Sequence, residues 1–171
     1  CRTTGKSVPI VAGLDISMQP IPVYPTPDGA AALKNWKHSE FTKGNAAEFL
    51  YKIIKDNSHE VTLIAIGNMT NIATLFQKYP DASELLKGLF VMNGYFGTEK
   101  LPDPCWNWNS WADPSASGIV FGAAVALHRV IPLDVTDMLT IDAQSASKLL
   151  PANSLLMRAI FDFGNAWLTN S

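Results

Sequence analysis

Apolar residues along this chain recur with two different spacings. One is the spacing of a helix face, and it predicts amphipathic helices over residues 46–54 and 72–79, the second ended by Pro80. Short apolar runs predict strands instead, and residues 61–66 form a nearly continuous run of the kind found in strands buried on both faces. Further strands are predicted at residues 8–12, 89–92 and 125–133.

Helix start signals complete this pattern. Asp113 followed by Pro114 predicts a capping residue and the first helical position. Two more helices are expected over residues 142–150 and 154–167, the latter capped by Asn153. Because strands and helices alternate, the sequence predicts an α/β fold with a mainly parallel sheet.

The position of a site follows from this fold class. Ligands of open parallel sheets bind beyond the carboxyl ends of the strands. The segments that follow Ile66, Met92 and Leu133 are therefore the places where functional residues are expected.

Composition is consistent with one well-buried domain and excludes several kinds of partner. The 171 residues are 47% hydrophobic and 16% charged, which argues against disorder. Thirteen basic and fifteen acidic side chains give a net charge of −2, so nothing indicates binding to nucleic acid or to a membrane surface. Two cysteines make no disulfide framework and favour a reducing compartment such as the cytoplasm. The three histidines are scattered, which speaks against zinc.

Three polar segments follow the predicted strands. Residues 93–114 interleave tryptophans with asparagines, which suits sugar hydroxyls and planar rings, or equally a loop that packs on the sheet edge and caps its own turns. Residues 66–73 turn from strand into helix, with Thr70 or Asn71 as the cap. Asp134 and Asp137 follow the third strand and suit a metal, a hydroxyl or a turn.

These segments occur in the same order as motifs of the inosine–uridine nucleoside hydrolases. Residues 66–73, IGNMTNIA, resemble the family's GPLTNIA turn, and residues 90–94, FVMNG, resemble its VVMGG strand end. Residues 108–121 resemble FNxxADPEAAxIVF, and residues 132–136 match PLDVT. Residues 8–13 are similar to an earlier IPVxxG strand, so the resemblance covers nearly the whole chain.

The resemblance implies a nucleoside hydrolase fold, an open and mainly parallel sheet with helices on both faces, in one partial domain over residues 1–171. It implies an enzyme that hydrolyses the N-glycosidic bond of ribonucleosides to ribose and free base. One Ca²⁺ is expected to hold ribose hydroxyls and the attacking water. Family members commonly associate as homodimers or homotetramers.

Individual residues carry parts of this expectation. Ile66 occupies the position whose backbone carbonyl binds Ca²⁺. Met92 matches a methionine that lines the ribose pocket, and Asn109 matches an asparagine that holds a ribose hydroxyl. Asn107 stands where the family usually has a glutamate that contacts the 5′-hydroxyl. Met92, Asn107 and Asn109 are thus the expected substrate-binding residues.

The expected catalytic groups are not among these 171 residues. The family's DTDPGxDDA segment supplies the aspartate base and most calcium carboxylates, and a late His-Asp pair serves the leaving base; neither is found here. The chain is therefore interpreted as a central fragment, inactive alone. One alternative is a non-catalytic nucleoside- or ribose-binding relative. Another is a different glycosidase, for which no carboxylate pair is persuasively placed.

Overall fold

The structure is a computed structural model that describes residues 8–19, 44–97, 107–140, 142, 145 and 155–170. The chain divides into two compact units. Residues 11–22 and 42–139 form the unit that contains the sheet, and residues 1–10, 23–41 and 140–171 form the other. The expectation of one domain over residues 1–171 stays a prediction.

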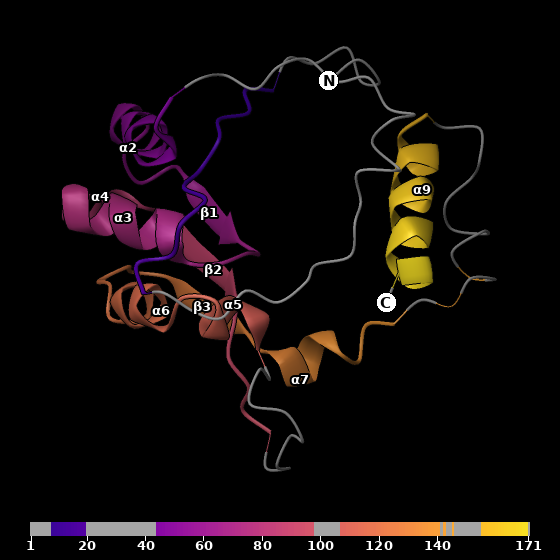
Figure 1. Ribbon diagram of the computed structural model, residues 1–171. Helices are drawn as coiled ribbons and strands as arrows, with labels where there is room; N and C mark the ends of the chain where they lie inside the picture. Colours follow the sequence, from indigo (N-terminus) through magenta and orange to yellow (C-terminus); the bar gives the residue numbers. More distant parts are fainter. Residues whose placement is uncertain are drawn as a thin grey trace. The chain divides into compact units, whose positions relative to one another are not determined.

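A three-stranded parallel sheet lies at the centre of the sheet-containing unit (Figure 1). Its strands are β1 (Thr62–Ala65), β2 (Gly88–Met92) and β3 (His128–Ile131), in the order β1-β2-β3. The strands predicted at residues 61–66, 89–92 and 125–133 are thus confirmed, and so is their parallel pairing.

The strand predicted at residues 8–12 does not form, and within that run only Val11 makes an isolated bridge. Pro9 lies inside the run, and it lacks the N–H group that a sheet ladder requires. Apolar composition alone was therefore a poor indicator of a strand at this position.

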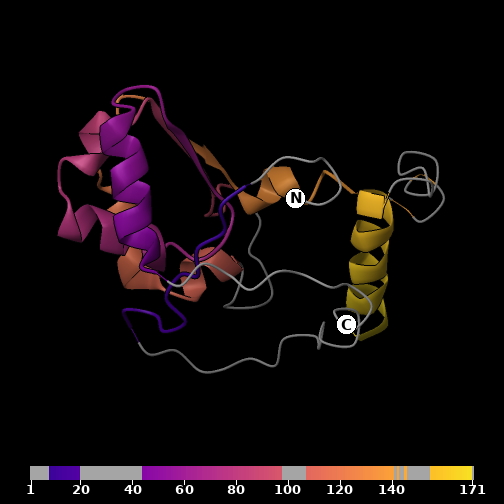
Figure 2. The ribbon, with the colours of Figure 1, turned by 90° about the horizontal axis from the view of Figure 1, so that it is seen from above.

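Three helices pack on one face of the sheet (Figure 2). They are α2 (Ala46–Asp56), α3 (Thr70–Lys78) and α6 (Pro114–Phe121), and the helices predicted at these places are confirmed. The core between helices and sheet is made of fully buried apolar side chains: Ile54, Leu75, Leu89, Val91 and Val120. Three shorter helices are α4 (Ala82–Leu85), α5 (Trp108–Trp111) and α7 (Leu133–Thr136).

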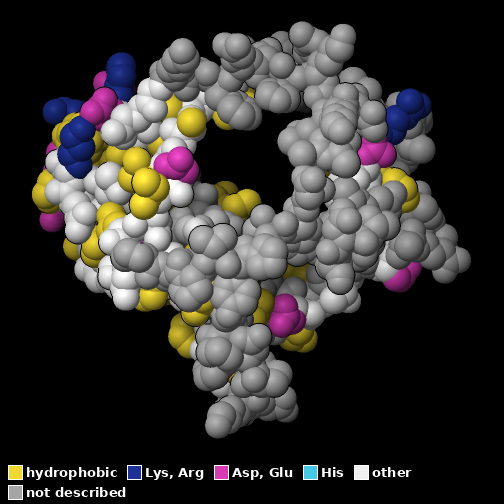
Figure 3. Space-filling view, in the orientation of Figure 1, with side chains coloured by type: hydrophobic (Ala, Val, Ile, Leu, Met, Phe, Trp, Pro, Cys, Tyr) yellow, Lys and Arg dark blue, Asp and Glu magenta, His cyan; other side chains and the backbone are white. Residues whose placement is uncertain are grey.

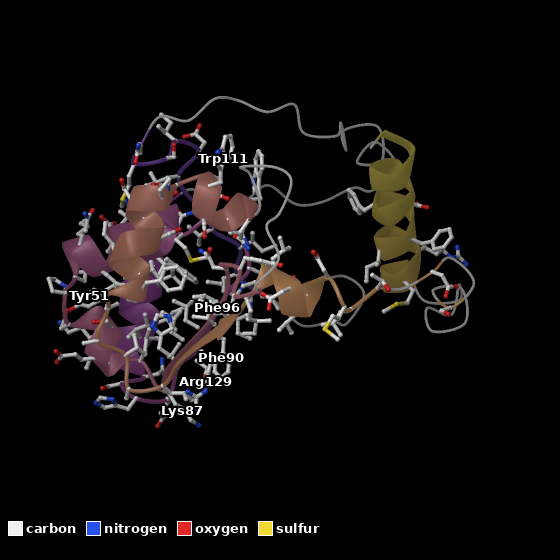
Figure 4. The ribbon with its side chains drawn as sticks, turned by 90° about the horizontal axis from the view of Figure 1, so that it is seen from below. Tyr51, Lys87, Phe90, Phe96, Trp111 and Arg129 are labelled. Atoms are coloured by element: carbon white, nitrogen blue, oxygen red, sulfur yellow. The ribbon has the colours of Figure 1, made fainter. Side chains whose placement is uncertain are left out.

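The opposite face of β1 is open, and the prediction that this strand is buried on both faces is wrong. Ile64 and Ile66 are 69% and 77% exposed, whereas Ala65 between them is buried. The reason is that the described helices of this unit cover only the Ala65 side. Phe90 and Arg129, which are in register with Ile64, point to the side of the strands away from those helices (Figure 4).

The last predicted helix is confirmed as α9 (Leu155–Asn170), in the other unit. Its expected cap, Asn153, lies outside the described residues. The helix expected over residues 142–150 also falls largely outside them, although Asp142 accepts hydrogen bonds from the backbone and hydroxyl of Ser145. Across the described part of the chain, no helix combines the length and apolar character needed to cross a membrane.

The outer surface of α2 carries charges of both signs, which lie side by side in Figure 3. Lys78 of α3 donates to Glu48 over 2.5 Å, and this hydrogen bond raises the pKa of Lys78. Beside this pair, the rings of Tyr51 and Tyr79 stack with centroids 3.9 Å apart. Tyr51 belongs to α2 and Tyr79 ends α3, so the two helices are joined by ring stacking as well as by charge. Within α2, Lys55 also lies over the Tyr51 ring.

The carboxylate of Asp113 joins three separate segments of this unit. It caps α6 as predicted, because Oδ1 accepts from Ala116 N over 3.1 Å. Its Oδ2 accepts from the Thr70 hydroxyl over 2.6 Å and from Met18 N over 2.7 Å. Asp113 is fully buried, so these donors compensate for the water that the charge has lost.

The start of α3 is organised differently from the prediction. Neither Thr70 nor Asn71 caps the helix, since the capping position is Met69, which makes no side-chain cap. The Thr70 hydroxyl is committed to Asp113, and Asn71 Oδ1 accepts from Leu14 N over 2.7 Å. Long-range contacts thus replace the local cap.

We expect Asp113→Ala to lower the free energy of unfolding by at least about 2 kcal/mol, because the helix cap is lost and buried donors are left unpaired. Denaturant unfolding measures this change. Asp137→Ala, at an exposed aspartate at the end of α7, is the control and is expected to change stability little. Equal stability of the two variants would contradict the role given to Asp113.

His128 is the first residue of β3. Its Nε2 is buried and finds no hydrogen-bond partner among the described residues, while its ring stacks on Phe121 with centroids 6.3 Å apart. Burial lowers the pKa of His128 below its usual value of 6.5. The folded protein therefore favours the neutral ring.

This pKa shift predicts a pH dependence of stability. Below about pH 6.5, His128 of the unfolded chain binds a proton that the folded protein disfavours. The free energy of unfolding therefore decreases as the pH falls below this value, and above it this destabilisation is absent. Unfolding free energies measured at about pH 7.5 and about pH 5.5 should differ more in the wild type than in His128→Phe. His59→Asn, at an exposed histidine with φ of 61°, serves as the control and is expected to retain the wild-type difference. An unaltered difference in His128→Phe would refute the assignment.

Candidate functional site at the carboxyl ends of β1 and β2

Asn109, in α5, connects the carboxyl ends of two neighbouring strands. Its Nδ2 donates to the carbonyl of Met92 over 2.9 Å and to the carbonyl of Ile66 over 3.4 Å. The same nitrogen lies 3.4 Å from Met92 Sδ. The structure thus brings together three residues that the sequence had marked, although they are far apart along the chain.

The orientation of the Asn109 amide follows from these partners. Two carbonyl oxygens accept from it, so the nitrogen must face the strands and Oδ1 must face away. Among the described residues, no donor is recorded for Oδ1 of this mostly buried side chain. An amide oxygen at this place has the chemistry to accept a hydrogen bond from a ligand hydroxyl.

Asn107 has a different task from Asn109. Its Oδ1 accepts from Ser110 N over 3.1 Å, which caps α5, and its Nδ2 donates to Gly94 O over 3.1 Å. Asn107 is also buried, and both the oxygen and the nitrogen of its amide are hydrogen-bonded within the protein. Its expected contact with substrate stays a prediction, whereas its role in holding α5 is explicit in the structure.

Gly94 forms the turn between β2 and the segment that follows it. Its φ is +79°, which glycine adopts without the penalty that other residues pay. The carbonyl of Gly94 accepts from Asn107 Nδ2 and, over 2.9 Å, from Leu133 N at the start of α7. One peptide group therefore holds both α5 and α7 at the end of β2.

Asn93 is a residue that the sequence interpretation did not single out. It follows Met92 directly and is fully buried. Its Oδ1 accepts from Gly94 N over 2.7 Å and from the Ser110 hydroxyl, and its Nδ2 lies 3.4 Å from Ser117 Oγ. The sequence does contain a signal for it, because Asn93 stands where the family's VVMGG motif has its first glycine.

The two acidic residues after β3 lie in α7 and at its end. Asp134 Oδ1 accepts from Phe96 N over 3.1 Å, and Asp137 is exposed at the end of α7. Of the tryptophans, Trp108 and Trp111 lie with ring centroids 5.3 Å apart, and Trp108 is 42% exposed. Trp106 lies outside the described residues.

A calcium site requires more oxygen ligands than the described residues of this region provide. Ca²⁺ takes six to eight oxygens at about 2.3–2.6 Å. The described residues contain no group of three or more histidine, cysteine, aspartate or glutamate side chains that could hold a metal. The Ile66 carbonyl is the one predicted ligand among them, and it already accepts from Asn109. These residues do not by themselves fit a calcium ion.

Comparison with known proteins establishes the family. The model of the family described as inosine-uridine preferring nucleoside hydrolase matches residues 1–169. This chain belongs to that family. The membership recognised from the ordered motifs is therefore confirmed, and the family is one of hydrolases.

Curated relatives agree with this assignment. The pyrimidine-specific ribonucleoside hydrolase RihA of Salmonella schwarzengrund is 30% identical over 100 residues, which cover 58% of this chain and 32% of that protein. The protein of the same name from Citrobacter koseri is 26% identical over 121 residues, which cover 69% and 38%. The chain thus spans about a third of the length of these relatives.

Solved structures confirm the fold. A plant nucleoside hydrolase, the PpNRh1 enzyme, superposes with a TM-score of 0.79 at 16% identity, over 95% of this chain and 53% of that one. The purine-preferring ribonucleoside hydrolase from Gardnerella vaginalis gives 0.78 at 18% identity, over 95% and 54%. The α/β nucleoside hydrolase fold expected from the sequence is confirmed, although the described helices of the sheet-containing unit cover only one of the two sheet faces on which helices were expected.

Proposed function

We propose that the complete protein hydrolyses the N-glycosidic bond of ribonucleosides and releases ribose and a free base. The observation that carries this proposal is the Asn109 amide, whose nitrogen donates to the carbonyls of Met92 and Ile66, so that its oxygen faces away from both strand ends. It lies at the carboxyl ends of parallel strands, where ligands of such sheets bind.

The sugar is the part of the substrate that these residues suit. Asn109 Oδ1 accepts a hydrogen bond from a ribose hydroxyl, and the Met92 side chain offers an adaptable apolar surface beside it. Glycoside hydrolysis passes through a transition state with positive charge on the sugar ring. An amide oxygen held in place before the reaction stabilises that charge without reorganisation.

The general base that removes a proton from the attacking water is proposed to be a side chain other than those of the described residues. Among the described residues, no carboxylate hydrogen-bonds to Asn109 or Met92; Asp113 and Asp134 are committed to backbone and hydroxyl donors elsewhere. That the 171 residues alone lack hydrolytic activity is a further proposal, which rests on the family resemblance and not on the described residues. Calcium binding through the Ile66 carbonyl is likewise a proposal for the complete protein.

A second candidate is a non-catalytic protein that binds nucleosides or ribose with the same fold. The observation in its favour is Asn107, whose amide is fully used inside the protein where the family motif has a carboxylate. Calorimetry on the complete protein separates the two functions. Binding of inosine or uridine without release of base supports the second candidate.

The names of the relatives leave the base open, since one is called pyrimidine-specific and another purine-preferring. Both inosine and uridine are therefore needed as substrates in the tests. A homodimer or homotetramer and a cytoplasmic location are further proposals, which rest on the family resemblance and on the low cysteine content.

We expect the complete protein to release base and ribose from inosine or uridine, and Asn109→Ala to lower kcat/KM about two- to tenfold or more, because a neutral hydrogen bond contributes about 0.5–1.5 kcal/mol. Asn45→Ala is the matched control, since Asn45 caps α2 and is expected to affect stability but not kinetics. Absence of base release from both nucleosides would reject the proposed hydrolysis. Unchanged kinetics of a folded Asn109→Ala variant would remove Asn109 from the site.

Calcium dependence has its own test. We expect a chelator to abolish hydrolysis by the complete protein and added Ca²⁺ to restore it, with ligand protection against thermal unfolding as a second measurement. Mg²⁺ is the control, because its smaller shell and octahedral preference fit a calcium site poorly. Full activity and an unchanged melting temperature in the presence of chelator would show that calcium is not required.

A further inference from the structure

Asn93 and Ser110 form a buried contact between the end of β2 and the helix that carries Asn109. The Ser110 hydroxyl donates to Asn93 Oδ1, and Asn93 is fully buried. Ser110 is the neighbour of Asn109 in α5, a helix of four residues. So short a helix has little internal stability, and its position depends on its attachments.

Two attachments fix the two ends of this helix to the same turn. At its start, Asn107 caps the helix and donates to Gly94 O. Towards its end, Ser110 donates to Asn93 Oδ1, which also accepts from Gly94 N. The helix is therefore held against residues 93 and 94, directly after Met92, whose carbonyl accepts from Asn109.

We propose that Asn93 is a positioning residue for ribonucleoside binding, which acts through Ser110 by setting the place of Asn109 at the ends of β1 and β2. Asn93 does not touch the substrate. It fixes the α5 backbone next to Asn109, so the Asn109 oxygen is held ready for a ligand hydroxyl. This inference rests on the proposed function.

Burial adds to the cost of breaking this contact. Asn93 and Asn107 are both excluded from water, so a broken contact leaves a polar group without a partner. Any arrangement of residues 93 and 94 that breaks the contact with Ser110 is therefore disfavoured relative to the observed one. Asn93 N also donates to Ile131 O over 3.1 Å, so the residue itself stays in register with β3.

The test compares serine variants in the complete protein, with inosine and uridine as substrates. Ser110→Ala removes the hydroxyl and is expected to lower kcat/KM about two- to tenfold, in the same sense as Asn109→Ala. Ser110→Thr keeps the hydroxyl and is expected to retain wild-type kinetics. Ser83→Ala is the matched control, since Ser83 is a buried serine of α4 that donates to Pro80 O.

A double-variant cycle distinguishes positioning from general stabilisation. If Ser110 acts through Asn109, then Ser110→Ala causes no further loss of kcat/KM in the Asn109→Ala background, although the melting temperature still decreases. Losses of kcat/KM that add fully would overturn the proposal. So would wild-type kinetics in a folded Ser110→Ala variant.

Failure of the proposed function is recognised separately. If the wild type releases no base, binding of D-ribose and inosine is measured by calorimetry and by the fluorescence of the α5 tryptophans. Weaker binding by Ser110→Ala than by Ser83→Ala then supports positioning without catalysis. Equal binding by the two variants, or no binding by the wild type, overturns the positioning role.

Discussion

The Asp113 carboxylate is the contact on which the arrangement of the sheet-containing unit depends. It accepts hydrogen bonds from Met18 N, the Thr70 hydroxyl and Ala116 N, so it joins an N-terminal segment to the starts of α3 and α6. Only Ala112 separates Asp113 from the end of α5. The buried charge therefore fixes where α6 begins and, with it, where the short helix before it must end. A charge excluded from water requires all of these donors at once, which makes the arrangement specific.

Neutral amides dominate the other end of α5, and this choice has a physical reason. The carbonyls of Ile66 and Met92 need a donor where the strands stop pairing, and an amide donates there while keeping an acceptor on its other side. A carboxylate at Asn109 would repel both carbonyls, and a lysine would leave no acceptor for a ligand. Asparagine therefore satisfies the strand ends and presents a hydrogen-bonding oxygen with one side chain.

Local pattern was sufficient to predict most of the sheet and the long helices. The apolar runs located β1, β2 and β3, and the Asp113-Pro114 pair located the start of α6, because each signal acts within a few residues. The exposure of Ile64 and the capping of α3 were not predictable in this way. Both depend on segments that are distant in the sequence. The described helices cover only one face of β1, and the Asn71 side chain accepts a hydrogen bond from Leu14 N instead of capping α3.

The site shows the same division between local and long-range information. Ordered motifs identified Ile66, Met92 and Asn109, and the structure brings them together. They gave no indication that Asn107 is occupied at both ends of its amide or that Asn93 holds Ser110, because these contacts appear only when the turn at Gly94 places α5 over the end of β2. Residues that resemble ligand-binding positions and residues that hold them in place thus lie next to one another, at the end of β2 and in α5. If the proposed function holds, we expect a change at a positioning residue such as Asn93 or Ser110 to weaken binding, because these residues share buried hydrogen bonds with the helix that carries Asn109.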